Sequence, residues 1–372
     1  MVEFWRSGGG IDTVAPELAA GIEAAGWDGQ VFMDSQSLGG DPYALMGAWA
    51  MATRRLQLAT GVTNPLTRHP AVSAAAIATV HWLSRGRAVL GIGRGDSALA
   101  FLGHGPAGLA AFESALAALQ SLLRREAVPF AAHPATDAAP SSAALPLSGR
   151  PTDARLAWLP EGLAKVPLDV AATGPKVIGM AARIAERVTF SVGASPERLA
   201  WAAELARATR RAAGLDAAGL GLGAQLVVIC HPDRAAMLEP AAGMVAPLAR
   251  FQVMLQDAAG PQSADDAANL AAIRGGYDMR GHGSYLPKDK LSGVQLGRDF
   301  VERFAIVGPP EHCVRRLREL VALGIERFVV LGPGFHAEAR GPGTCLFAEE
   351  VMPAFNRHRD CGTAAADAPA ER

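Results

Sequence analysis

The chain has 372 residues, half of them apolar, which is enough to bury the core of a large α/β fold. Its 35 basic and 36 acidic residues leave a net charge of −1, so the sequence predicts neither a nucleic-acid partner nor a membrane-surface partner. No apolar run approaches the length that spans a bilayer, the N-terminus lacks the pattern of a signal peptide, and the four scattered cysteines fit a cytoplasmic protein with reduced thiols. The scarcity of lysine beside arginine and alanine is typical of bacteria with GC-rich genomes.

The first half of the chain alternates buried strands with helices. Apolar residues repeat at three- and four-residue spacing in the helices and form short unbroken runs in the strands. Asp41 can cap one helix, and Pro70 can open the next because the first turn of a helix needs no N–H group at that position. The expected strands are 4–5, 30–34, 56–62 and 87–93, and the expected helices are 13–25, 42–54, 70–86 and 107–125.

The second half continues this alternation around two insertions. Residues 128–165 are rich in Pro, Ala and Ser with little periodicity, so we expect an insertion that serves as a lid or a subunit contact. A second insertion, mainly helical, is expected at 233–300, and a disordered tail at 358–372. The expected strands are 168–173, 187–193, 222–230 and 327–331, and the expected helices are 177–186, 195–213, 312–323 and 347–355.

Eight strands that alternate with helices predict a (β/α)8 barrel, also called a TIM barrel, formed by one domain over residues 1–357. An open doubly wound sheet has the same alternation and is the alternative. The glycine-rich run 91–96 is not the dinucleotide fingerprint of that alternative, because its sixth position is Asp96 instead of glycine. In a barrel, functional residues lie at the carboxyl ends of the strands.

The turn after the third expected strand concentrates polar side chains. Gly61 and Val62 end the strand, Thr63 and Asn64 follow it, and three more polar residues stand at 67–69. A glycine at this point lets the backbone bend or allows a ligand to approach closely. The cluster fits the active rim of a barrel, although an ordinary well-capped loop would have the same composition.

The loops after the fourth and fifth expected strands carry groups suited to an anion. Backbone N–H groups at a helix start favour a negative charge, and nearby cations add to this preference. Neighbouring barrel strands would put the two loops side by side, although each alone fits a turn with solvated cations. The residues are Gly93 and Arg94 after the fourth strand, and Thr173, Gly174, Pro175 and Lys176 after the fifth.

Three residues are candidates for catalytic roles on the substrate side. Asp34 and Gln36 follow the second expected strand, and His282 lies in the second insertion. A carboxylate or an imidazole at the rim can act in general acid–base catalysis. Each also has a structural interpretation, since Asp34 can cap the next loop and His282 can be exposed to solvent. For His69, which precedes Pro70, we favour packing at the start of the helix.

The run 60–70 and the run 171–176 resemble the luciferase-like flavin-dependent oxidoreductases, and the resemblance covers roughly residues 1–335. The branch that the chain most resembles contains the deazaflavin-dependent methylenetetrahydromethanopterin reductases. The resemblance implies that Thr173–Lys176 is a loop for the cofactor phosphate. It also implies a non-proline cis peptide at Gly61–Val62, behind the cofactor ring, with a trans peptide as the alternative.

The sequence leaves two compounds possible as the cofactor. Members of the family use either reduced coenzyme F420, a deazaflavin that transfers hydride, or reduced FMN, which forms a peroxy adduct for monooxygenation. The run 60–70 favours an F420-dependent oxidoreductase that acts on a small organic molecule, with an FMN-dependent monooxygenase as the alternative. We add Gly193, at the end of the sixth expected strand, to the expected cofactor site. A homodimer or a larger homo-oligomer is the expected assembly.

Other functions are less compatible with the sequence. A Schiff-base aldolase needs a lysine on a strand, but none of the four lysines lies in an expected strand. A metal-dependent hydrolase needs clustered histidines and carboxylates, and no such spacing occurs, so no metal is expected. A flavin-binding barrel without catalysis stays open, because binding and catalysis would use the same loops.

Overall fold

The computed structural model describes residues 1–8, 14–130, 144–282, 294–332 and 345–355. Eight parallel strands form a closed barrel, since β8 pairs with β9, β9 with β11, and β11 with β1. The predicted (β/α)8 barrel is therefore confirmed, and this closure rules out the open doubly wound sheet. In order around the barrel the strands are β1 (Glu3–Gly8), β2 (Gly29–Phe32), β3 (Gln57–Thr60), β4 (Ala88–Ile92), β7 (Leu168–Ala172), β8 (Arg187–Phe190), β9 (Gly221–Cys230) and β11 (Arg327–Leu331).

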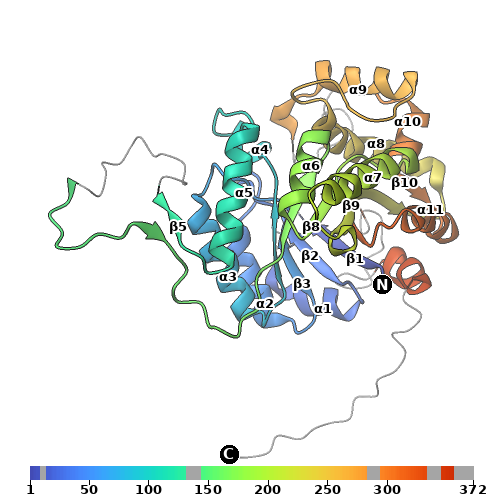
Figure 1. Cartoon of the computed structure of the whole chain (residues 1–372). Helices are drawn as coiled ribbons and strands as arrows, with labels where there is room; N and C mark the ends of the chain where they lie inside the picture. Colours follow the sequence, from blue (N-terminus) through green and yellow to red (C-terminus); the bar gives the residue numbers. More distant parts are fainter. Residues whose placement is uncertain (9–13, 131–143, 283–293, 333–344, 356–372) are drawn as a thin grey trace, which may run out of the picture.

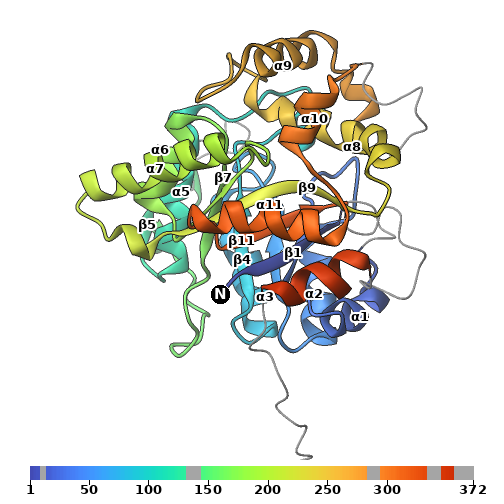
Figure 2. The same ribbon diagram turned by 90° about the vertical axis from the view of Figure 1, so that its right-hand side faces the viewer.

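Helices surround the strands, and those of the second insertion stand together at one end of the barrel (Figures 1 and 2). Within the described residues, no helix is long and apolar enough to cross a membrane. The helices are α1 (Ala19–Ala24), α2 (Pro42–Ala52), α3 (Pro70–Leu83), α4 (Ser97–Ala100), α5 (Leu109–Leu123), α6 (Pro175–Ile184), α7 (Pro196–Ala212), α8 (Arg234–Ala249), α9 (Ala264–Gly276), α10 (Arg298–Phe304) and α11 (Pro310–Ala322).

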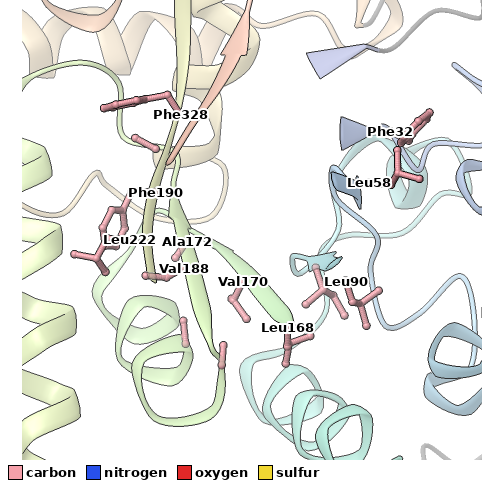
Figure 3. Packing of buried hydrophobic residues seen from close by; sticks show 14 of the residues in the cluster. Phe32, Leu58, Leu90, Leu168, Val170, Ala172, Val188, Phe190, Leu222 and Phe328 are labelled. Atoms are coloured by element: carbon pink, nitrogen blue, oxygen red, sulfur yellow. The ribbon is translucent and has the colours of Figure 1, made fainter. Parts of the chain in front are cut away.

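The barrel strands send alternate side chains outward and inward. The outward side chains and the helices form the main core, and Figure 3 shows members of it on β7, β8 and β9, namely Leu168, Val170, Ala172, Val188, Phe190 and Leu222. A smaller apolar cluster fills the barrel interior, made of Trp5, Val31, Ala59, Val89 and Val329. The inward position between Leu168 and Val170 is occupied by Asp169, so the interior also contains charge.

The helix starts follow the predicted capping. Asp41 precedes α2 and accepts hydrogen bonds from the backbone N–H groups of Tyr43 and Ala44. His69 precedes α3, and its Nδ1 accepts a hydrogen bond from the N–H of Ala71, which confirms the structural interpretation of this histidine. These caps fix the direction in which the loops after β2 and β3 enter their helices.

Several short elements were missed by the sequence patterns. The strand β10 (Ile306–Gly308) pairs with the last residues of β9, and β5 (Val128–Pro129) pairs with β6 (Asp153–Ala154) inside the first insertion. Segments of two or three residues are too short to show a period of two. The predicted last helix is a π-helical turn followed by a 3-10 turn, Phe347–Val351 and Met352–Ala354. The predicted disordered tail lies outside the described residues.

Candidate functional site

A cavity with a volume of about 1660 Å3 lies between the carboxyl ends of the barrel strands and the helices of the second insertion. Ten of the fourteen residues proposed from the sequence line it. They come from the loops after β2, β3, β4 and β7 and from the second insertion, and they are Asp34, Gly61, Val62, Asn64, Gly93, Arg94, Thr173, Gly174, Lys176 and His282.

The other four proposed residues do not line the cavity. The side-chain amide of Gln36 donates a hydrogen bond to the backbone oxygen of Ala98 at 2.8 Å. Thr63 is fully buried, and Pro175 is the first residue of α6. Gly193 has a φ of +84°, and a Cβ at this position would lie 2.7 Å from the ring of Phe304. Glycine is therefore required at 193 by the packing of α10 against the loop.

The turn after β3 contains a cis peptide bond between Gly61 and Val62, the isomer that the family resemblance implied. Val62 lies against the end of β4, where a Cβ on Gly93 would be 3.1 Å from Val62 Cγ2. Asn64 is buried, and its side-chain oxygen accepts hydrogen bonds from the N–H groups of Leu66 and Thr67. The turn is thus held from within, and Val62 stands at the cavity wall.

Asp34 is held by charge and hydrogen bonds beside this turn. Its Oδ2 accepts from Thr63 Oγ1 at 2.6 Å and from Arg68 Nη1 at 2.5 Å, and Arg68 also pairs with Asp41 at 2.6 Å. Burial alone would lower the pKa of Arg68, but the two carboxylates raise it above its ordinary value. Arg68 therefore stays protonated and fixes the Asp34 carboxylate in one position at the cavity.

The loops after β4 and β7 present donors to the cavity. Arg94 lines the cavity, and its Nε donates a hydrogen bond to the backbone oxygen of Ala107 at 2.6 Å. Gly174 precedes α6 and has no side chain that could cap the N–H groups of the first turn. The start of α6, Lys176 and Arg94 thus line one cavity, and each offers groups that favour a negative charge.

The second insertion contributes a series of connected polar groups, which begins at Asp96 in the loop after β4. Arg250 forms an ion pair with Asp96, and its guanidinium lies 5.0 Å from the centre of the Tyr277 ring. The Tyr277 hydroxyl lies 2.5 Å from Nδ1 of His282. Burial raises the pKa of Tyr277 to about 12, and burial also lowers the pKa of His282. A protonated tyrosine therefore stands beside a neutral imidazole, an arrangement that can pass a proton.

Two of these groups have weak signals in the sequence. Asp96 follows β4 in a polar turn, so the rule that function lies after barrel strands includes it. Tyr277 stands five residues from His282 without a recognisable motif. Arg250 and Asp96 are 154 positions apart in the sequence, and no local sequence pattern predicts a contact between residues so far apart.

Gln252, at the end of the segment that follows α8, is 7% exposed and borders the cavity. Neither atom of its side-chain amide has a hydrogen-bond partner among the described residues. A buried amide without partners costs about 1–3 kcal/mol, so it destabilises the protein as it stands.

Replacing this glutamine with a methionine, Gln252→Met, is expected to raise the free energy of unfolding by about 1 kcal/mol, because methionine has a similar volume and needs no partner. Urea denaturation measures the change. Gln262→Met is the control, since Gln262 is exposed in the same insertion and its stability effect should be near zero. A loss of stability in Gln252→Met would show that the amide is paired in solution.

The floor of the cavity contains a buried ion pair inside the barrel. Arg327 Nη2 lies 2.7 Å from Asp169 Oδ2, and Thr189 Oγ1 donates to the same carboxylate at 2.9 Å. The guanidinium of Arg327 also lies over the indole of Trp5, 5.8 Å from the ring centre. Asp169 and Thr189 line the cavity, so any bound molecule lies above a polar and tightly connected floor.

The family model described as luciferase-like monooxygenase matches residues 12–327 of the chain. A 5,10-methylenetetrahydromethanopterin reductase of Methanolobus tindarius is 26% identical over 297 residues, which are 79% of this chain and 82% of that protein. An F420-dependent glucose-6-phosphate dehydrogenase of Beutenbergia cavernae is 28% identical over 328 residues, which are 83% of this chain and 81% of that protein.

Solved structures share the fold. The coenzyme F420 dependent tetrahydromethanopterin reductase from Methanopyrus kandleri aligns with a TM-score of 0.65 at 20% identity, over 95% of this chain and 99% of that one. At 20% identity, the structural similarity shows only that the two proteins share the barrel fold.

Proposed function

Since the chain belongs to the luciferase-like monooxygenase family, a family of oxidoreductases, we propose that it uses reduced coenzyme F420 to transfer hydride to or from a small organic substrate. The observation that carries this proposal is that the turn at Val62 and the anion site at Lys176 line one cavity. A tricyclic coenzyme with an anionic tail needs a wall for its ring and a cationic end for its tail.

The residues present fit such a coenzyme. Val62, on the turn after β3, offers an apolar wall for the ring. Lys176, Arg94 and the N–H groups at the start of α6, which no side chain caps, would hold the phosphate of the tail. When bound, the deazaflavin supplies the hydride, and the protein orients it and keeps water away from it.

Proton transfer is assigned to the second insertion in this proposal. His282 is neutral because burial lowers its pKa, and it is connected to the protonated Tyr277 at 2.5 Å. Asp34 already has two partners on one oxygen, so its carboxylate positions the loop after β2 and repels a negative charge nearby. His282 is thus better suited than Asp34 to exchange a proton with the substrate.

A reduced-FMN-dependent monooxygenase is the second candidate, because the matching family model is described as a luciferase-like monooxygenase. FMN has a comparable ring and a phosphate, so the same wall and the same anion site serve it. The two candidates differ in the reaction of the reduced coenzyme with oxygen.

The proposed function is tested by titrating the full-length protein separately with F420 and with FMN, following the fluorescence of each coenzyme. We expect micromolar binding of F420 and turnover that does not consume oxygen. Binding of FMN with oxygen-dependent turnover would favour the second candidate. Micromolar binding of neither compound would reject both, and tight binding of F420 without any hydride transfer would leave a barrel that only binds the coenzyme.

A further inference from the structure

Three cysteines lie close together where the second insertion joins the barrel. Cys230 is the last residue of β9, Cys313 lies in the first turn of α11, and Cys345 lies shortly before the π-helical turn. None of these three residues lines the cavity, and none is in a disulfide. The proposed function therefore makes no use of this group of thiols.

One backbone carbonyl brings Cys230 and Cys313 together. The strand β10 pairs with the end of β9, and this pairing sets Gly308 opposite Cys230. The oxygen of Gly308 accepts a hydrogen bond at 2.9 Å from the N–H of His231, the residue that follows Cys230. The same oxygen accepts from Cys313 Sγ at 3.4 Å. The carbonyl that joins β10 to β9 thus also holds the sulfur of Cys313 at the end of β9.

The two thiols differ in their access to solvent. Cys313 is fully buried, whereas Cys230 is partly exposed. The hydrogen bond between the two side chains raises the pKa of Cys230, and burial adds to this shift, so the thiol stays protonated and reacts slowly with weak oxidants. When Cys230 does react, a second thiol stands beside it, and an oxidised sulfur next to a thiol condenses to a disulfide.

The pair lies at the base of the second insertion. The chain enters the insertion directly after Cys230, through the loop that leads to α8, and it returns through α10 and β10 to α11. A bond between Cys230 and Cys313 would join the entry of the insertion to its return, next to the backbone pairing of β9 and β10. The same insertion carries Tyr277 and His282 at the cavity.

We propose that Cys230 and Cys313 form a redox-sensitive modification site, at which oxidation to a disulfide fixes the base of the second insertion. The S–S bond forms as the two S–H bonds break, and a two-electron thiol oxidant takes up the two electrons and two protons. With diamide as the oxidant, the N=N bond takes up both and becomes the hydrazine. The inference rests on the placement of the thiols and is independent of which coenzyme binds.

The test treats the full-length protein with diamide and maps its thiols by mass spectrometry after alkylation. We expect a cross-linked peptide that joins Cys230 to Cys313 within one chain and that dithiothreitol cleaves. The oxidised protein should melt at least about 4 °C higher than the reduced protein, because a disulfide that closes a long loop restricts the unfolded chain.

Single substitutions assign the effect to this pair. Cys230→Ala and Cys313→Ala should each abolish the cross-link and the gain in melting temperature. Cys345→Ala is the matched control, since this buried thiol also lies near Cys230, and it should retain both. If Cys313→Ala is destabilised in the reduced state, Cys230→Ala decides, because its side chain is partly exposed.

A cross-link from Cys230 to Cys345, or the absence of any cross-link within the chain, would overturn the inference. A bond between Cys230 and Cys313 that leaves the melting temperature unchanged would show that it does not fix the insertion. The proposed function is tested on the reduced protein, so its failure and the failure of this inference are separate results.

Discussion

Arg327→Met is expected to lower the free energy of unfolding by about 3–5 kcal/mol, because it removes the cation that is hydrogen-bonded to the buried carboxylate of Asp169. Arg327 is 4% exposed and Asp169 is 8% exposed, so water has little access to the pair. The arginine Nη2 also lies 3.1 Å from Thr189 Oγ1, and that hydroxyl already donates its hydrogen to Asp169. The substitution therefore breaks a connected network instead of one contact.

The glycine at position 223 leaves space for the guanidinium of Arg327. A Cβ on Gly223 of β9 would lie 2.9 Å from Arg327 Nη2, so the absence of a side chain at 223 allows the arginine to lie flat inside the barrel. Methionine would fill part of that space but would satisfy neither oxygen of Asp169. The expected loss thus comes mainly from the lost ion pair and its hydrogen bonds, and only in small part from packing.

Two variants separate these contributions in urea denaturation. The double variant Arg327→Met/Asp169→Asn removes both charges and should recover most of the lost stability, since the amide oxygen introduced at position 169 can still accept from Thr189. Arg211→Met breaks an exposed ion pair with Glu204 and should cost less than about 1 kcal/mol. If Arg327→Met costs no more than Arg211→Met, the pair inside the barrel contributes nothing to stability.

The sequence was sufficient to predict the barrel and one half of the cavity. Short apolar runs that alternate with amphipathic helices define the order of the strands, and polar residues placed directly after those runs must lie at the carboxyl rim. Asp34, Arg94 and Lys176 were found by this rule, Val62 was implied by the family resemblance, and all four line the cavity. Such predictions succeed because each depends only on a residue's position relative to its own strand.

The other half of the cavity depends on contacts between distant parts of the chain. Arg250 meets Asp96 across 154 positions and Arg327 meets Asp169 across 158, and neither pair leaves a periodic signal. Gly193 shows a related difficulty, since a glycine after a strand is compatible with ligand approach and with close packing. The ring of Phe304 decides between them, and its position follows only from the fold of the second insertion.

Lys176→Ala is expected to weaken the binding of F420 about 10- to 100-fold, because a hydrogen bond between charged groups contributes about 1.5–3 kcal/mol. Lys176 is exposed and lines the cavity, so its removal should change the free energy of unfolding by less than about 0.5 kcal/mol. The loss of affinity should shrink as the ionic strength rises, since added salt screens the attraction that the variant lacks. Fluorescence titration at two salt concentrations measures both effects.

A second lysine provides the crossed control. Lys165 pairs with Glu186 at 2.9 Å and does not line the cavity, so Lys165→Ala should lower stability by up to about 1 kcal/mol and leave the affinity for F420 unchanged. The deazaflavin without its phosphate completes the design, because Lys176→Ala should bind it as well as the unchanged protein does. If the variant loses affinity for the phosphate-free compound to the same degree, Lys176 contacts the ring end of the coenzyme. In that case the anion site after β7 would have to be abandoned.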